Sequence, residues 1–74
     1  MDLVVGQTRN EKYIVISLEI QGNNLYRLTS SIDNEIDYDI VLQSDEKEAI
    51  ECFKNLQLKY FDKVINNGDF GVTT

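Results

Sequence analysis

The segment Tyr13–Ile20 places an aliphatic residue at every second position, and no other feature constrains the fold as strongly. One side of an extended chain would carry four aliphatic side chains: Ile14, Ile16, Leu18 and Ile20. Such sustained alternation, rich in β-branched side chains, is typical of a strand with one buried face. A sheet with one apolar face needs a second layer to cover it, so the pattern predicts a two-layer domain.

Three further segments have the composition of strands, and they cover about residues 3–5, 25–29 and 36–43. In the last of them the aliphatic residues alternate with Asp37 and Asp39, which we expect to share the face opposite the core. A slip of one residue would bury Asp39, so the alternation also fixes the register of this strand. Tyr26 and Tyr38 are in phase with the aliphatic residues, and we expect them to join the core.

Residues 46–66 have the pattern of an amphipathic helix. Asp45 is the expected N-cap, and Glu48 completes a variant of the capping box. At about 100° per residue, one stripe carries five apolar or aromatic residues: Ala49, Phe53, Leu56, Tyr60 and Val64. The expected stop ends at Gly68, because glycine adopts the left-handed cap without strain. We expect the tail, residues 69–74, to be loose.

These elements predict a single domain over residues 1–74 that belongs to the α+β class. Short connections favour antiparallel neighbours, so we expect a meander of three to four strands with one C-terminal amphipathic helix packed on one face. The chain has a single cysteine, Cys52, and no histidine, so neither an internal disulfide nor a histidine-containing zinc site can staple it. Cys52 lies at the edge of the helix stripe, and we interpret it as a buried structural thiol.

The sequence also indicates a compartment. The residues from Met1 to Gly6 include no basic segment followed by a long apolar run, so no signal peptide is predicted. No segment approaches the roughly 18 apolar residues of a membrane helix. A single free thiol suits a reducing compartment. We therefore expect a cytoplasmic protein that makes no contact with membranes.

The composition argues against enzyme chemistry. Histidine, the commonest general base, is absent, and there is no glycine-rich phosphate loop. Asp33–Asp37 resembles a calcium loop in its carboxylate spacing, but Tyr38 and Ser44 occupy the positions that require Gly and Glu. We predict no enzyme activity, and therefore no catalytic residue, cofactor or metal ligand.

The negative charge is concentrated in one stretch. Residues 33–51 contain eight carboxylates and one lysine, a net charge of −7, whereas the whole chain has −6. A strong negative field at one end of the fold would repel nucleic acid and attract protein partners with a basic surface, so we expect no direct nucleic-acid binding. We select these candidate partner-binding residues in the stretch: Asp33, Glu35, Asp37, Asp39, Glu48 and Glu51.

Two interpretations of the acidic stretch stay open. Charges on an edge strand and in the first turn of a helix can serve only to block aggregation and to complement the helix dipole. Alternatively, the carboxylates imitate phosphates, because alternate residues on one strand face are about 6.6–7 Å apart, near the phosphate spacing of a DNA strand. The chain would then be a nucleic-acid mimic of the phage or mobile-element type that inhibits a DNA- or RNA-handling enzyme.

A second candidate surface is an apolar strip, formed by Leu58, Phe61 and Ile65 at i, i+3 and i+7. Either the C-terminal tail or a second chain would cover it, and a homodimer is one form of the latter. The sequence as a whole predicts a small acidic, non-catalytic module that binds protein. The nucleic-acid mimic is the alternative, and an accessory or ligand-binding module of an enzyme ranks third.

Overall fold

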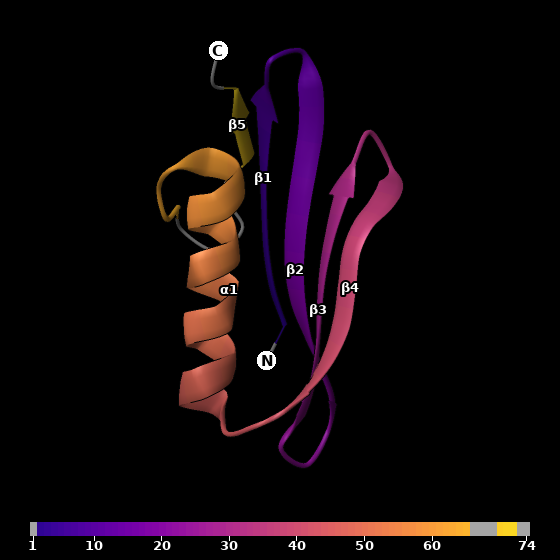
Figure 1. Ribbon diagram of the computed structural model, residues 1–74, viewed down its shortest axis with the longest axis vertical. Coiled ribbons are helices and arrows are strands. Elements are labelled where there is room, and N and C mark those ends of the chain that lie inside the picture. The colour runs from indigo at the N-terminus through magenta and orange to yellow at the C-terminus, as the bar shows by residue number, and fades with distance from the viewer. Residues whose placement is uncertain (1, 66–69, 73–74) are drawn as a thin grey trace.

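The computed structural model describes residues 2–65 and the backbone of residues 70–72. Within these residues the elements are β1 (Leu3–Arg9), β2 (Lys12–Gly22), β3 (Leu25–Ile32), β4 (Glu35–Gln43), α1 (Glu46–Phe61) and β5 (Phe70–Val72). The strands form one sheet in the order β4-β3-β2-β1-β5, and α1 packs against it (Figure 1).

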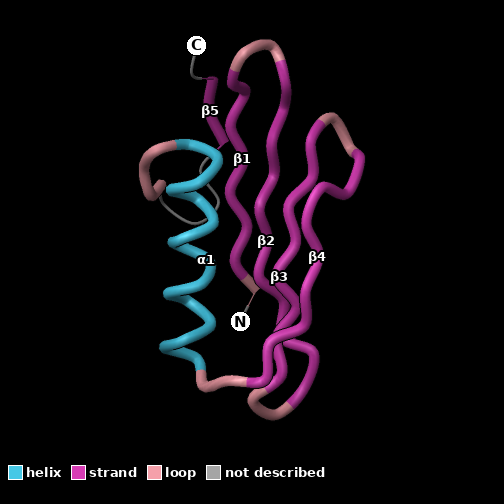
Figure 2. Tube along the Cα trace, in the orientation of Figure 1, coloured by secondary structure: helices cyan, strands magenta, loops and turns pink. Residues whose placement is uncertain are grey.

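The first four strands form an antiparallel meander, which confirms the predicted α+β fold with a single helix packed on the sheet. Each strand is longer than its pattern indicated, and tight turns explain the extra length. Arg9 pairs with Lys12, and Ile32 pairs with Glu35, so very short loops join these strands. The loop residues all have the positive φ that type I′ hairpins require: Asn10, Glu11, Asp33 and Asn34. Figure 2 shows both turns at the same end of the sheet.

The core lies between α1 and the sheet. Its buried apolar residues come from β1, β2, β3 and α1: Val5, Ile14, Ile16, Leu18, Tyr26, Leu28, Ala49, Phe53, Leu56 and Phe61. The predicted helix stripe is confirmed at its centre by Phe53 and Leu56, and Tyr26 is buried as expected. Tyr38 packs partly against the same cluster.

The helix begins where the sequence predicts. The Asp45 carboxylate accepts a hydrogen bond from the Glu48 N–H at 2.8 Å. This bond satisfies one of the free N–H groups of the first turn, so the predicted N-cap is confirmed.

The helix ends earlier than the predicted residue 66, and this prediction is wrong. Asp62 adopts the left-handed conformation, with a φ of 60°, and its N–H closes the last turn on the Leu58 carbonyl at 3.0 Å. Arg9 of β1 donates a hydrogen bond to the Tyr60 carbonyl at 2.8 Å, so a contact from the sheet satisfies the helix end. The predicted stop at Gly68 lies outside the described residues.

The C-terminal tail is not loose throughout. Phe70–Val72 form β5, which pairs in parallel with β1 and places Phe70 opposite Gly6. β5 therefore covers the edge of β1 that the meander leaves open. The prediction of a loose tail is wrong for these residues, while residues 69, 73 and 74 lie outside those that the structure describes. Among the described residues, no helix has the length and apolar character needed to cross a membrane.

Candidate functional site

The helix does not cover the whole apolar face of the sheet. α1 packs most closely on β2, with a smaller contact to β3. The apolar side chains of the edge strand β4 are left only half-buried, and these are Tyr38, Ile40 and Leu42. A groove of about 300 Å³ lies between the helix and this strand. We call it the α1/β4 groove, and its lining residues are Leu28, Tyr38, Ile40, Cys52, Asn55, Leu56 and Lys59.

The helix wall of the groove follows from helical spacing. Cys52, Asn55 and Lys59 lie at i, i+3 and i+7, so they share one side of α1. The Lys59 ammonium lies 5.9 Å from the ring centre of Tyr38 and 5.7 Å from that of Tyr60, within cation–π range. Cys52 was expected to be buried, but the structure leaves it half-buried in the groove wall.

A β-bulge in β4 changes where its carboxylates point. Ser30 pairs with Tyr38 and Ser31 pairs with Ile36, so Asp37 has no partner in the ladder. The Asp37 carboxylate accepts a hydrogen bond from the Tyr60 hydroxyl, which in turn accepts one from Ser30 Oγ at 2.9 Å. Asp37 therefore lies on the helix side of the sheet.

This polar link also affects the Tyr60 hydroxyl. Burial raises the pKa of Tyr60, and the hydrogen bond to the Asp37 carboxylate raises it further. The neutral hydroxyl is thus the form that the fold favours. The link ties the edge strand to the last turn of α1 at one end of the groove.

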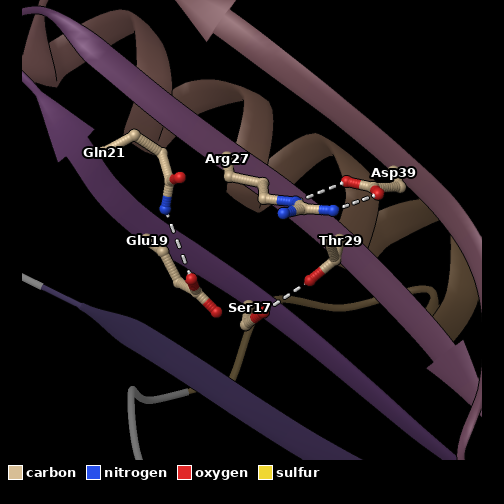
Figure 3. Close-up of polar contacts among 6 residues, drawn as sticks. All are labelled: Ser17, Glu19, Gln21, Arg27, Thr29 and Asp39. Carbon is tan, nitrogen blue, oxygen red and sulfur yellow. Dashed lines mark hydrogen bonds and ion pairs between the residues drawn. The ribbon is translucent and has the colours of Figure 1, made fainter.

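Asp39 lies on the opposite, uncovered face of the sheet. It accepts two hydrogen bonds from Arg27, at 2.9 Å and 2.6 Å, and Figure 3 shows this pair with α1 behind the sheet. The hydrogen bond from Arg27 holds the pKa of Asp39 below its usual range, and the same bond raises the pKa of Arg27. Beside them, the hydroxyls of Ser17 and Thr29 are 2.6 Å apart (Figure 3). The prediction that Asp37 and Asp39 share one face is therefore wrong, because the bulge separates them.

The other selected carboxylates do not complete a single acidic surface. Asp33 lies in the β3–β4 turn, where its carboxylate accepts a hydrogen bond from the Tyr13 N–H at 2.9 Å. Asp33, Glu35 and Asp37 all line one shallow hollow, together with Lys12. Glu48 and Glu51 are exposed on α1, which begins at the other end of β4 from that turn (Figure 1). Three of the six selected carboxylates thus lie together near the β3–β4 turn, whereas Asp39, Glu48 and Glu51 lie elsewhere on the molecule.

The three residues of the predicted apolar strip are not exposed together. Phe61 is only 4% exposed and belongs to the core, and Ile65 is partly buried against it. Leu58 alone is substantially exposed, at 47%. Phe61 lies four residues after the buried Gln57 and so shares the buried side of α1, whereas Ile65 lies beyond the end of the helix, where helical spacing no longer applies.

Two features of the site were missed in the sequence. Gln57 is 1% exposed, and its side-chain oxygen accepts a hydrogen bond from the Ile65 N–H at 2.9 Å, which holds the segment after α1. Its position four residues after Phe53 places it beside the core stripe, but its polar side chain conceals this. The groove itself was also missed, because it depends on which strands the helix covers.

In the part of the chain that the structure describes, no three side chains of the metal-binding types gather to hold an ion. No protein-family model, no curated protein and no solved structure matches the chain. The geometry of the surface therefore carries the argument for function.

Proposed function

We propose that the chain is a non-catalytic, protein-binding module whose partner occupies the α1/β4 groove. The observation that carries this proposal is the incomplete cover of the sheet: α1 packs on β2 and β3, while apolar side chains of β4 remain half-buried. Burying apolar surface is the main favourable term in most protein association, and this groove offers a partner apolar side chains to bury.

The chemistry of the groove supports binding rather than catalysis. Its walls are mainly aliphatic and aromatic, with one thiol and one ammonium among them. Cys52 and Lys59 are separated by about 10 Å along the helix axis. At that separation the ammonium does not activate the thiol as a nucleophile, which requires direct contact.

The nucleic-acid mimic is the second hypothesis from the sequence, and no feature of the described residues favours it. It required a regular row of carboxylates on one face. Asp37 is instead bound to Tyr60 on the helix side, and Asp39 is paired with Arg27 on the other. We therefore put forward protein binding alone.

The experiment compares partner capture by two tryptophan variants of the helix. Asn55→Trp fills the groove from an exposed position in its wall. Leu58→Trp is the matched control, since Leu58 is also exposed on α1 but does not line the groove. With immobilised protein and lysate of the source cells, a stoichiometric partner should be retained by the wild type and by Leu58→Trp, and lost by Asn55→Trp. The proposal fails if the wild type retains no partner, or if both variants retain it equally.

A further inference from the structure

The strand that borders the groove is also an edge of the sheet. β4 is the outermost strand in the order β4-β3-β2-β1-β5, so the described strands pair with one side of it only. The opposite edge of the sheet is occupied by β5. An edge strand presents backbone N–H and C=O groups that can pair with another chain.

The register identifies which backbone groups of β4 point outward. The Ser44 N–H donates to the Asn24 carbonyl at 3.0 Å, and this pair continues the ladder in which Leu42 lies opposite Tyr26 and Ile40 opposite Leu28. In an antiparallel ladder, hydrogen-bonded and non-hydrogen-bonded pairs alternate. Leu42, Ile40 and Tyr38 therefore direct their N–H and C=O groups toward β3. The alternate residues direct theirs away from the sheet, and these are Asp39, Val41 and Gln43.

The outward-pointing groups belong to a regular part of β4. The β3–β4 register shifts only between Ser30 and Ser31, opposite Asp37, and it is regular from Tyr38 to Gln43. Bulges are one means by which edge strands avoid pairing with other chains. The bulge thus disturbs the beginning of β4 and leaves the register regular from Tyr38 to Gln43.

A chain added beside this part of β4 would contact both faces of the sheet. Adjacent strands are about 4.8 Å apart, and successive side chains alternate between faces. On the helix side, every second side chain would lie beside Tyr38 and Ile40, which line the α1/β4 groove, and beside Leu42. On the other side, the neighbour would be Val41, which is 61% exposed.

The acidic residues of β4 and α1 indicate the charge of the partner segment. The charged residues of β4 are Glu35, Asp37 and Asp39, and of these only Asp39 has an ion-pair partner among the described residues, Arg27. Glu48 and Glu51 are exposed in the first turns of α1, which begins three residues after the end of β4. A second copy of this chain would bring the same charge against itself, whereas a segment rich in lysine and arginine would be attracted.

We infer that β4 accepts an extended, basic segment of a partner protein as an additional strand, with apolar residues of that segment at alternate positions facing the groove. This inference rests on the proposed function and specifies its partner. Main-chain hydrogen bonds from Asp39, Val41 and Gln43 would hold the segment, and the groove would select its side chains.

The test uses a short synthetic peptide of alternating lysine and valine, added to the complete chain. At a peptide concentration about ten times its Kd, exchange of the outward amides should slow about tenfold, because only the free fraction exchanges. The amides are those of Asp39, Val41 and Gln43, followed by NMR hydrogen exchange. A peptide with glutamate in place of lysine, and a lysine peptide N-methylated on alternate backbone nitrogens, should both leave the exchange unchanged.

Two variants of Val41 separate strand addition from simple charge attraction. Val41→Pro removes an outward N–H while sparing the β3–β4 ladder, the position at which edge strands tolerate proline. It should abolish the protection of Asp39 and Gln43 by the lysine peptide, whereas Val41→Thr should retain it. An unchanged exchange rate at Ile40, whose N–H faces β3, would show that the sheet remains folded.

Several results would overturn the inference: no binding of the lysine peptide, equal protection by the N-methylated peptide, or protection that survives Val41→Pro. Protection that develops with protein concentration alone would assign the edge to a second copy and would also overturn it. If Asn55→Trp abolishes partner capture but Val41→Pro does not, the groove function stands and strand addition fails.

Discussion

The guanidinium of Arg9 donates a hydrogen bond to the backbone carbonyl of Tyr60 at 2.8 Å, which joins the end of β1 to the end of α1. The same side chain makes a 2.5 Å ion pair with Asp62, the residue in the left-handed C-cap position. A cation at this place complements the negative end of the helix dipole and satisfies a carbonyl that lacks an intrahelical partner.

We expect Arg9→Met to lower the free energy of unfolding by about 1 kcal/mol, because it removes a charge-assisted hydrogen bond at a helix terminus. Methionine keeps most of the apolar stem, so packing changes little. Urea denaturation followed by circular dichroism measures the difference. Lys63→Met is the control, since Lys63 is an exposed cation that directly follows Asp62 in the sequence. Equal stability of the two variants would show that Arg9 does not hold the helix end.

The core prediction concerns Phe53, which is 4% exposed at the centre of the helix stripe. Phe53→Ala should cost about 3–5 kcal/mol through lost burial and the cavity that remains. This is comparable with the total stability of many small domains, so extensive unfolding at room temperature is expected. Leu58→Ala, at an exposed helix position, should melt close to the wild type. A Phe53→Ala protein that melts within a few degrees of wild type would contradict the observed helix orientation.

Tyr60 gives the fold a dependence on alkaline pH. Its pKa is raised in the folded chain by burial and by the Asp37 carboxylate, so the fold favours the neutral hydroxyl. The corresponding stability is fully present below the ordinary tyrosine pKa of about 10, and it is lost as the pH rises through the raised value.

Tyr60→Phe should therefore be less stable than the wild type at neutral pH, by about 1 kcal/mol for the lost hydrogen bonds. Above about pH 10 the gap between the two proteins should narrow, because only the wild type has this phenol to ionise. Thermal melting of both proteins across this range gives the comparison, and the other tyrosines and the lysines are common to both. A gap that stays constant with pH would contradict the raised pKa of Tyr60 in the folded chain.

The sequence predicts those parts of the fold whose signals are local. The N-cap Asp45 is recognisable because its partner Glu48 is one turn away, and the alternation in β2 directly reflects which face is buried. The end of α1 is different, because it depends on Arg9, a residue 51 positions away from Tyr60. The sequence of the helix itself therefore does not indicate this contact.

The candidate site was harder to predict for the same reason. The bulge at Asp37 exists only in the register between β3 and β4, and it reverses the face on which a carboxylate lies. The incomplete cover of β4 depends on where α1 crosses the sheet. The charge counted along the sequence therefore suggested one acidic surface, whereas in the folded chain Asp37 and Asp39 lie on opposite faces of the sheet.

The last prediction tests whether the remaining exposed carboxylates attract the partner. Glu48→Gln combined with Glu51→Gln should slow association with the lysine–valine peptide and change dissociation less, because complementary fields act mainly on the rate of encounter. Both side chains are exposed on α1, and the Asp45 cap and the paired Asp39 are left intact.

The matched control replaces Glu11 and Glu19 with glutamine, which changes the net charge by the same amount on β2 and its turn, away from the groove. Stopped-flow measurements at several salt concentrations should show a steeper salt dependence for the wild type and the control than for the helix variant. Exposed charges are screened beyond about 8 Å at physiological ionic strength. Only carboxylates near the outer edge of β4 should therefore influence the rate of association with the peptide strongly. Equal rates for the two double variants would mean that overall charge, and not the position of Glu48 and Glu51, governs association.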